Sequence, residues 1–188
     1  LVIAAGRKAI AACRYIKKIK PSCFVVYIQD PRVSSSQFDM VALPAHDPTR
    51  GDNVLVTTGA PNRITKKRLT AAKKGFKTLN NLPTPRTAVL IGGNSRDYEM
   101  SPQDAAKLAA QLANLNTSLM ITTSRRTGKA NESIIKNALA GKENCYHWDG
   151  TGENPYFAML ALADHIIVTG DSASMLSESC TTGTPTYM

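Results

Sequence analysis

The residues from Asp171 to Glu178 combine a small-residue turn with a helical pattern, and this combination is typical of an anion-binding site. An apolar β-branched run ends just before Asp171, and either Asp171 or Ser172 can cap the helix that follows. The first amide groups of a helix have no partner within it and, with the helix dipole, attract anions. The pattern therefore favours a phosphate at the turn formed by Asp171, Ser172, Ala173 and Ser174. Glu178 shares a helix face with Ser174 and would contact a hydroxyl-rich group beside it. An ordinary capped turn is the alternative.

Two other clusters follow apolar runs and also contain residue types that bind phosphate. The first consists of Gly92, Gly93, Asn94 and Ser95, and the second of Ser124, Arg125 and Arg126. The glycine cluster lacks the Lys and Ser/Thr pair of a P-loop and the spacing of a dinucleotide fingerprint. The arginine pair can bind a diphosphate through bidentate hydrogen bonds. A tight turn is the alternative for the first cluster and a solvated loop for the second.

In the first half of the chain, His46 beside Asp47 is a candidate general base, because imidazole titrates near neutral pH. Asp30 follows another strand-like run and adds a carboxylate that would face an acceptor. The alternative for His46 is a loop histidine that completes a hydrogen-bond network. No Ser/His/Asp triad and no metal-ligand set can be assembled, so neither a metal nor a cofactor is expected.

The elements that must position these residues alternate between strands and helices. Strands are expected at 1–4, 24–28, 40–43 and 54–57, and then at 87–91, 119–123, 144–148, 166–168 and 184–188. Helices are expected at 7–18, 65–79 and 131–139, and also beginning near Ser101, Asn154 and Ser172. Such alternation predicts an α/β fold with parallel sheets and right-handed crossovers.

We expect two Rossmann-like, doubly wound halves, 1–82 and 83–188, because Pro83 and Pro85 end the helical pattern between them. The chain does not begin with Met and ends in a strand pattern, so we expect the first half to lack its start and the second its end. Ligands bind beyond the carboxyl ends of such strands, where nearly all the polar clusters fall. By the same rule, Trp148, Asp149, Gly150 and Asn154 are expected beside a bound ligand, and if that ligand is a nucleotide they would lie near its base or sugar.

The composition is that of a globular protein, with 43% hydrophobic and 20% charged residues among 188. No run approaches a membrane span, and the four cysteines lack metal-ligand spacing, which indicates a cytoplasmic protein. The net charge of +9 could attract nucleic acid, anionic lipid or phosphorylated small molecules. Its only dense cluster is Lys66-Lys67-Arg68 with Lys73-Lys74 on one expected helix, and no nucleic-acid motif appears. We therefore expect no nucleic-acid partner.

Six motifs together resemble the mitochondrial-fission ELM family, which comprises a plant protein and bacterial relatives. They are Gln29-Asp30-Pro31, Pro44-Ala45-His46-Asp47, Ile91-Gly92-Gly93-Asn94-Ser95, Thr122-Thr123-Ser124-Arg125-Arg126, Gly152-Glu153-Asn154-Pro155-Tyr156 and Asp171-Ser172-Ala173-Ser174-Met175. The resemblance covers essentially the whole chain.

The last motif is also similar, more distantly, to the donor site of GT-B glycosyltransferases and UDP-N-acetylglucosamine 2-epimerases. That resemblance implies that Ser172 and the amides of Ala173 and Ser174 hold a diphosphate and that Glu178 holds the ribose. The epimerase-like pattern has a pair of glycines after the serine, whereas this chain has Ala173 and Ser174, which restrict the approach of a phosphate to the backbone.

Two functions of different classes follow. In the first, a GT-B-like protein binds a nucleotide-sugar as substrate in the cleft between the two halves and transfers the sugar, with His46, Asp47 or Asp30 facing the acceptor. In the second, a non-catalytic adaptor of the ELM-family type binds a protein partner through the basic helix 65–79 and acts peripherally at a membrane surface.

Overall fold

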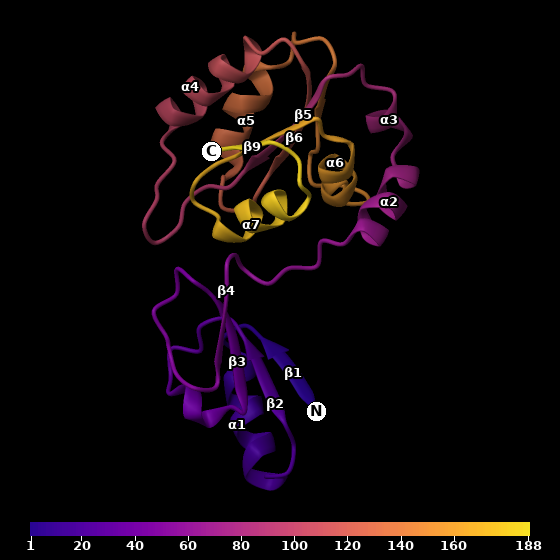
Figure 1. The fold of residues 1–188 in the computed structure, drawn as a ribbon. Coiled ribbons are helices and arrows are strands. Elements are labelled where there is room, and N and C mark those ends of the chain that lie inside the picture. The colour runs from indigo at the N-terminus through magenta and orange to yellow at the C-terminus, as the bar shows by residue number, and fades with distance from the viewer. The chain divides into compact units, whose positions relative to one another are not determined.

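The computed structural model describes residues 1–188 as two compact units, Leu1–Arg63 and Ile64–Met188. Each unit has its own sheet, and every strand pair in both sheets is parallel (Figure 1). The expected α/β class with two Rossmann-like parallel sheets is therefore confirmed. No helix has the length and apolar character needed to cross a membrane.

Unit 1, residues 1–63, contains a four-stranded sheet whose strands follow each other in chain order. Its elements are β1 (Val2–Ala5), α1 (Ala9–Ile19), β2 (Val25–Ile28), η1 (Ser35–Gln37), β3 (Met40–Pro44) and β4 (Val54–Thr57). Only the first connection is an α-helix, and a short 3-10 helix and loops join the other strands. All four strands lie within a residue or two of the expected ranges.

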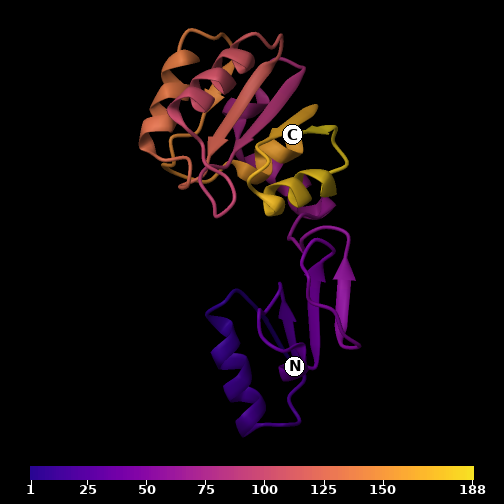
Figure 2. The same ribbon diagram turned by 90° about the vertical axis from the view of Figure 1, so that its left-hand side faces the viewer.

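The core of unit 1 lies between its sheet and α1, which packs along one face (Figure 2). Tyr27, Val41 and Leu43 are fully buried there against Cys13 of the helix. Side chains alternate along a strand, so the next residues face the other way. Ile3 and Leu55 do so and are 62% and 53% exposed. Within residues 1–63, α1 thus covers one face of the parallel sheet, and side chains on the other face are exposed.

Unit 2, residues 64–188, contains a five-stranded sheet in the order β7-β6-β5-β8-β9. Its elements are α2 (Lys66–Gly75), α3 (Lys77–Asn80), β5 (Arg86–Ile91), α4 (Pro102–Ala113), β6 (Ser118–Thr123), α5 (Lys129–Ala138), β7 (Cys145–His147), α6 (Tyr156–Leu162), β8 (His165–Val168), α7 (Ala173–Thr181) and β9 (Thr186–Tyr187). The chain runs outward from β5 through β6 to β7 and then returns to β8 on the other side. The strand order therefore reverses between β5 and β8, which is the topological switch point of a doubly wound sheet.

Helices cover both faces of this sheet, as a buried parallel sheet requires. Val89 and Ile91 of β5 pack against α4 and α5, which lie side by side (Figures 1 and 2). Ala88 and Leu90 point to the opposite face and pack in the cluster that contains α6. The near-continuous apolar sequence of β5 follows from this two-sided burial.

The basic helix expected at 65–79 differs from the prediction in one respect. Thr65 caps its start as expected and accepts a hydrogen bond from the Arg68 amide at 3.2 Å. At Phe76, however, the backbone leaves the helical region (φ −117°, ψ 79°), so α2 and α3 are separate helices. Phe76 turns inward to pack against the core of unit 2, which explains the break.

The division between the units falls between Arg63 and Ile64, earlier than the expected boundary between residues 82 and 83. Ile64 and Leu79 are buried in the cluster that contains α6, and Leu69 packs against it. Because these side chains complete the hydrophobic core of the second sheet, α2 and α3 belong to unit 2. The proline-rich stretch after α3 is a connection within unit 2.

Candidate functional site

The loops that follow β5 and β6 meet at the carboxyl edge of the sheet in unit 2. The Ser124 amide donates to the Ile91 carbonyl at 2.8 Å, and the Asn94 amide donates to the Arg126 carbonyl at 3.0 Å. The Thr127 hydroxyl also donates to the Gly92 carbonyl. The glycine cluster and the arginine cluster, which were expected at neighbouring strand ends, are therefore joined directly.

Asp171 follows β8 and reaches across the switch point into this pair of loops. Its carboxylate accepts hydrogen bonds from the Gly93 amide at 3.0 Å and from the Thr169 hydroxyl at 2.6 Å, and it forms an ion pair with Arg126 at 2.7 Å. Thr169 in turn accepts a hydrogen bond from the Gly92 amide at 2.7 Å. The Asp171 side chain is only 6% exposed, so an internal carboxylate occupies the turn between β5 and β8.

The two glycines of the loop are required by this arrangement. A Cβ atom on Gly92 would lie 2.0 Å from an Asp171 carboxylate oxygen. A Cβ atom on Gly93, whose φ is +156°, would lie 2.3 Å from the backbone of Arg126. Both glycines thus allow a close internal approach, and the Gly93 amide already binds the protein's own carboxylate.

The electrostatics of this turn keep Asp171 charged. Burial alone would raise the pKa of the Asp171 carboxyl, but the hydrogen bonds from Thr169, Gly93 and Arg126 outweigh it and lower the pKa below the ordinary value of 3.8. Arg126 also donates to the Asn94 carbonyl at 2.9 Å. Its guanidinium group is therefore held in place and largely neutralised by Asp171, whereas Arg125 is exposed and makes no such contact.

The start of α7 has donors that no group of the protein uses. Ser172 is the N-cap, and its hydroxyl accepts a hydrogen bond from the Met175 amide at 3.4 Å. The amides of Ala173 and Ser174 have no acceptor within the chain, and both residues are exposed. These amides are adjacent donors at a helix N-terminus, where the first N–H groups have no partner within the helix.

Glu178 lies one turn further along α7 and is positioned by a residue that the sequence did not single out. The Tyr156 hydroxyl, at the start of α6, donates to Glu178 Oε2 at 2.6 Å. Burial, and then the hydrogen bond to Glu178, raise the pKa of the Tyr156 phenol far above its ordinary value. Tyr156 therefore stays protonated and fixes one carboxylate oxygen, while Oε1 has no donor within the chain. Tyr156 ends one of the six family motifs, Gly152 to Tyr156, and this motif was the only signal in the sequence that could have pointed to a role for Tyr156.

The remaining expected residues of unit 2 mostly bond within their own loops. The Trp148 indole donates to the Thr151 carbonyl at 2.8 Å, and Asp149 accepts from the Thr151 hydroxyl at 2.6 Å across Gly150. Asn154 accepts a hydrogen bond from the Tyr156 amide at 2.9 Å at the start of α6. In the loop after β5, Asn94 and Ser95 likewise accept from backbone amides. These side chains shape the loops that flank the switch point.

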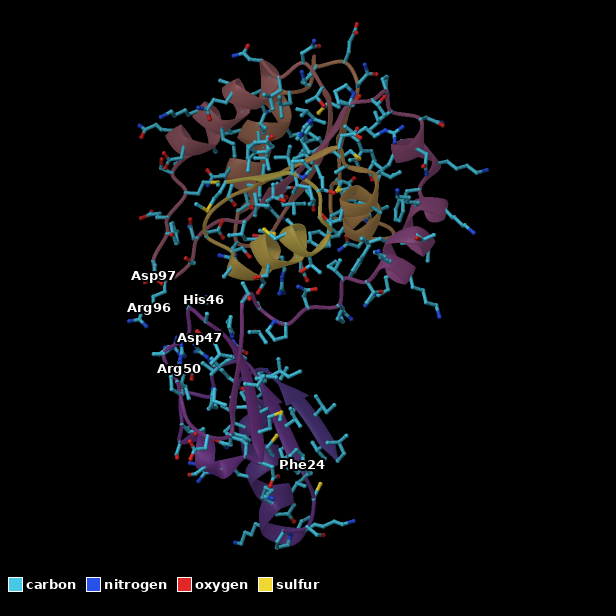
Figure 3. The ribbon with its side chains drawn as sticks, viewed as in Figure 1. Phe24, His46, Asp47, Arg50, Arg96 and Asp97 are labelled. Carbon is cyan, nitrogen blue, oxygen red and sulfur yellow. The ribbon has the colours of Figure 1, made fainter.

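A small cavity of about 120 Å³ adjoins the switch point next to the start of α4. It is lined by Gly93, Tyr98, Glu99, Met100, Asp104, Thr169, Gly170 and Asp171. The segment between β5 and α4 that borders it also carries Arg96 and Asp97, both exposed (Figure 3). Its lining carboxylates make this cavity a poor site for an anion, in contrast to the start of α7.

In unit 1, the three expected acid–base residues have different environments. His46 is exposed on the loop after β3, beside Asp47 and Arg50, while Phe24 lies at the opposite end of the sheet (Figure 3). The Arg50 guanidinium donates to the carbonyls of Ala45, Asp47 and Thr49 and so holds this loop together.

Asp30, by contrast, is only 8% exposed. It accepts hydrogen bonds from the Thr49 hydroxyl at 3.0 Å and from the Arg32 amide at 2.8 Å. These contacts join the end of β2 to the loop that carries His46, so in this structure Asp30 positions that loop. Among the three, His46 is the most accessible.

Two parallel α/β units, the second with a doubly wound sheet and polar loops at its switch point, define a two-domain protein of the Rossmann-like class. The chain belongs to the mitochondrial fission ELM1 family, whose profile matches residues 1–188. The family resemblance seen in the six motifs is thereby confirmed.

Two curated relatives match the whole chain. "Mitochondrial fission protein ELM1" of Arabidopsis thaliana is 32% identical over 217 residues, which cover 100% of this chain and 51% of the relative. "Uncharacterized protein RP120" of Rickettsia prowazekii (strain Madrid E) is 30% identical over 227 residues, which cover 100% of this chain and 64% of the relative. The chain thus spans between half and two thirds of the length of these relatives.

Solved structures align at lower similarity. A crystal structure of POFUT1 in complex with GDP aligns with a TM-score of 0.41 and 13% identity, covering 72% of this chain and 54% of that chain. A structure of the wall teichoic acid polymerase TagF soaked with CDPG aligns with a TM-score of 0.36 and 14% identity, covering 98% of this chain and 68% of that chain. The fold class given above depends on the strand order and pairing of the two sheets and not on these alignments.

Proposed function

We propose that unit 2 binds the diphosphate of a nucleotide-sugar at the start of α7 and that the protein transfers the sugar, as a glycosyltransferase of the GT-B-like type. One observation carries this proposal. At the switch point, the free amides of Ala173 and Ser174 lie one helical turn from Glu178, whose carboxylate is held by Tyr156. Open α/β sheets bind ligands at this position, and a helix N-terminus favours a phosphate there. Glu178 Oε1 would then accept a hydrogen bond from a ribose hydroxyl.

The same groups would serve the chemistry of sugar transfer. When the bond between the sugar and the diphosphate breaks, negative charge develops on the leaving phosphate, and fixed amide donors stabilise that charge. Arg125, which is exposed and unpaired, would add a cation, because Arg126 is already bound to Asp171. The acceptor hydroxyl must lose its proton as it attacks, and His46 is the candidate base, with Asp47 beside it. The nucleotide-sugar is a substrate in this scheme, and no cofactor takes part.

Calorimetry on the full-length protein with UDP, GDP and ADP, and with their sugars, tests the binding step. We expect one nucleotide family to bind, and Glu178→Ala to weaken it by about tenfold or more, because hydrogen bonds to charged groups contribute about 1.5–3 kcal/mol. Glu143→Ala is the matched control, since Glu143 is an exposed carboxylate on the loop after α5. If no nucleotide binds, or if both variants behave alike, the proposal is wrong.

The second candidate is a non-catalytic adaptor, and the name of the Arabidopsis relative, a mitochondrial fission protein, favours it. An adaptor would keep its partners when nucleotide binding is lost. Affinity capture with Glu178→Ala should therefore recover an unchanged partner set if the adaptor function is correct. Under either function we place the protein in the cytoplasm, because all four of its cysteines are unpaired.

A further inference from the structure

The entire net charge of the chain is concentrated in one stretch. Nine of the 23 lysines and arginines lie between Asn53 and Arg96, and this stretch contains no Asp or Glu. The other 14 basic residues are therefore balanced by all 14 acidic residues of the chain. Outside this stretch the protein is neutral, so the charge of +9 is a local property.

Within this stretch, α2 carries charges that oppose its own stability. Lys66, Lys67 and Arg68 occupy its first turn, where the helix dipole is positive, and no acidic residue accompanies them. By comparison, α4 has Asp104 and α5 has Glu132 in the first turn. An ordinary solvated helix face mixes both signs of charge and gains from pairs of opposite charge. The pattern in α2 is the one expected when an external anion supplies the missing negative charge.

The basic side chains from α2 to β5 fall into two groups: arginines that contact other groups of the protein, and lysines that have no acidic partner. The Arg68 guanidinium lies 4.4 Å from the centre of the Phe157 ring, and Arg86 donates to the carbonyls of Leu82 and Asn80. Five exposed lysines have no acidic partner, since the chain has only two ion pairs and both lie elsewhere. They are Lys66, Lys67, Lys73, Lys74 and Lys77, and we call them the lysine face.

The lysine face lies on the outer side of unit 2. Leu69 and Ala72 turn the other side of α2 towards α6, beside which α2 and α3 lie (Figure 1). Lys67 and Lys74 are seven residues apart, so two turns bring them to the same side of the helix, opposite the packed side. Lys66 and Lys73 have the same spacing. The two pairs lie about 100° apart around the helix axis, so the long side chains of all four lysines can still reach one flat surface.

We propose that the lysine face docks unit 2 on an anionic lipid surface. A folded protein partner is disfavoured, because lysine is depleted at protein interfaces and the exposed residues of α2 and α3 include no aromatic or large aliphatic side chain. A nucleic acid is disfavoured as well, because the sequence has no nucleic-acid motif and this face has no aromatic side chain on which a base could stack. Acidic headgroups, by contrast, need only clustered cations near their plane, and each lysine strengthens such binding by roughly fivefold.

Vesicle flotation with the full-length protein tests this docking. We expect binding to vesicles of phosphatidylcholine containing about 30 mol% phosphatidylserine, no binding to pure phosphatidylcholine, and release as the salt rises from about 0.1 M to about 0.5 M. The double variant Lys67→Glu/Lys74→Glu should weaken binding by at least about 25-fold. The matched control is Lys107→Glu/Lys136→Glu, which makes the same charge change on exposed residues of α4 and α5. It should change binding by less than about threefold.

Three results would overturn the proposal. The first is equal binding to neutral and acidic vesicles, and the second is an equal loss in the two double variants. The third is a failure to bind acidic vesicles while polyglutamate or duplex DNA binds and depends on Lys67 and Lys74, which would assign the face to an acidic protein or a nucleic acid. None of these outcomes depends on whether α7 binds a nucleotide.

Discussion

The Asp171 carboxylate lies 2.7 Å from the Arg126 guanidinium, and this ion pair joins the end of β8 to the loop after β6 across the switch point of unit 2. The same carboxylate accepts hydrogen bonds from Gly93 and Thr169. The turn that the sequence suggested for an anion thus already contains one, supplied by the protein. Under the proposed function, an external phosphate would bind beside this carboxylate, at the exposed amides of α7.

Asp171→Asn should destabilise the protein by about 1–3 kcal/mol, because an amide cannot replace all the hydrogen bonds and the charge of the buried carboxylate. The effect should depend on pH. The folded protein lowers the pKa of Asp171 below 3.8, so its stabilising contribution is present above that value and is lost as the pH falls below it. Denaturant unfolding at pH 7 and near pH 3 measures both effects. The variant should differ less from the wild type at the lower pH, and an equal difference at both would contradict this assignment.

Gly92→Ala should destabilise the protein by about 1–3 kcal/mol, because the added Cβ would overlap the buried Asp171 carboxylate and force it to move. Gly75→Ala at the end of α2 is the matched control, since no atom lies within 4 Å of its added Cβ. Alanine there should gain about 0.5–1 kcal/mol through its higher helix propensity. Thermal unfolding of the two variants should therefore shift in opposite directions, and a neutral Gly92→Ala would refute the close contact.

The strands of both units and the helix caps of unit 2 could be predicted from the sequence because their determinants are local. The apolar run 87–91 and the Ser101 capping box depend on neighbouring residues and were found within a residue or so. The break at Phe76 and the unit boundary at Ile64 depend on packing against α6, which lies 80 to 98 residues further along the chain. No window around Phe76 or Ile64 contains that information.

The candidate site was predictable to a similar extent. The rule that polar strand ends meet at one edge brought the 92–95 and 124–126 clusters together, as their hydrogen bonds confirm. The sequence did not reveal that Asp171 would bind the Gly93 amide and Arg126, because these residues lie 78 and 45 positions before it. Tyr156 was missed for the same reason, since its partner Glu178 lies on another helix.

Tyr156→Phe should weaken ribonucleotide binding by about 5- to 30-fold, because Glu178 would lose the donor that fixes its carboxylate. The loss should be smaller for the 2′,3′-dideoxy analogue, which offers no hydroxyl to Glu178. Calorimetric titration with both ligands measures the difference. Phe157→Leu is a suitable control, since the Phe157 ring packs edge-on against Tyr156 and carries no group that could donate to Glu178. If Tyr156→Phe weakens both ligands equally, Tyr156 has only a structural role.

The raised pKa of Tyr156 gives a second expectation. The phenol stays protonated in the folded state, whereas the unfolded chain ionises near the ordinary value of 10.0. A group whose pKa is raised by folding stabilises the protein below the unfolded value and loses that contribution as the pH rises above it. The stability of the wild type should therefore fall more steeply above about pH 10 than that of Tyr156→Phe, and parallel curves would argue against the buried hydrogen bond.

Removal of unit 1 tests where the second unit begins. A version of the protein that starts at Ile64 should fold cooperatively, because it keeps Ile64, Leu69 and Leu79 in the core beneath α6. A version that starts at Pro83 would lack α2 and α3 and expose the side chains that they cover, among them Phe157. Burial of each large aliphatic side chain contributes about 1.5–3 kcal/mol to the free energy of unfolding. The loss of several such contributions would remove a large part of a typical domain's stability. Circular dichroism during urea unfolding should show a cooperative transition for the first version and a weak or absent one for the second, and equal stability of the two would place the boundary at the proline-rich stretch after all.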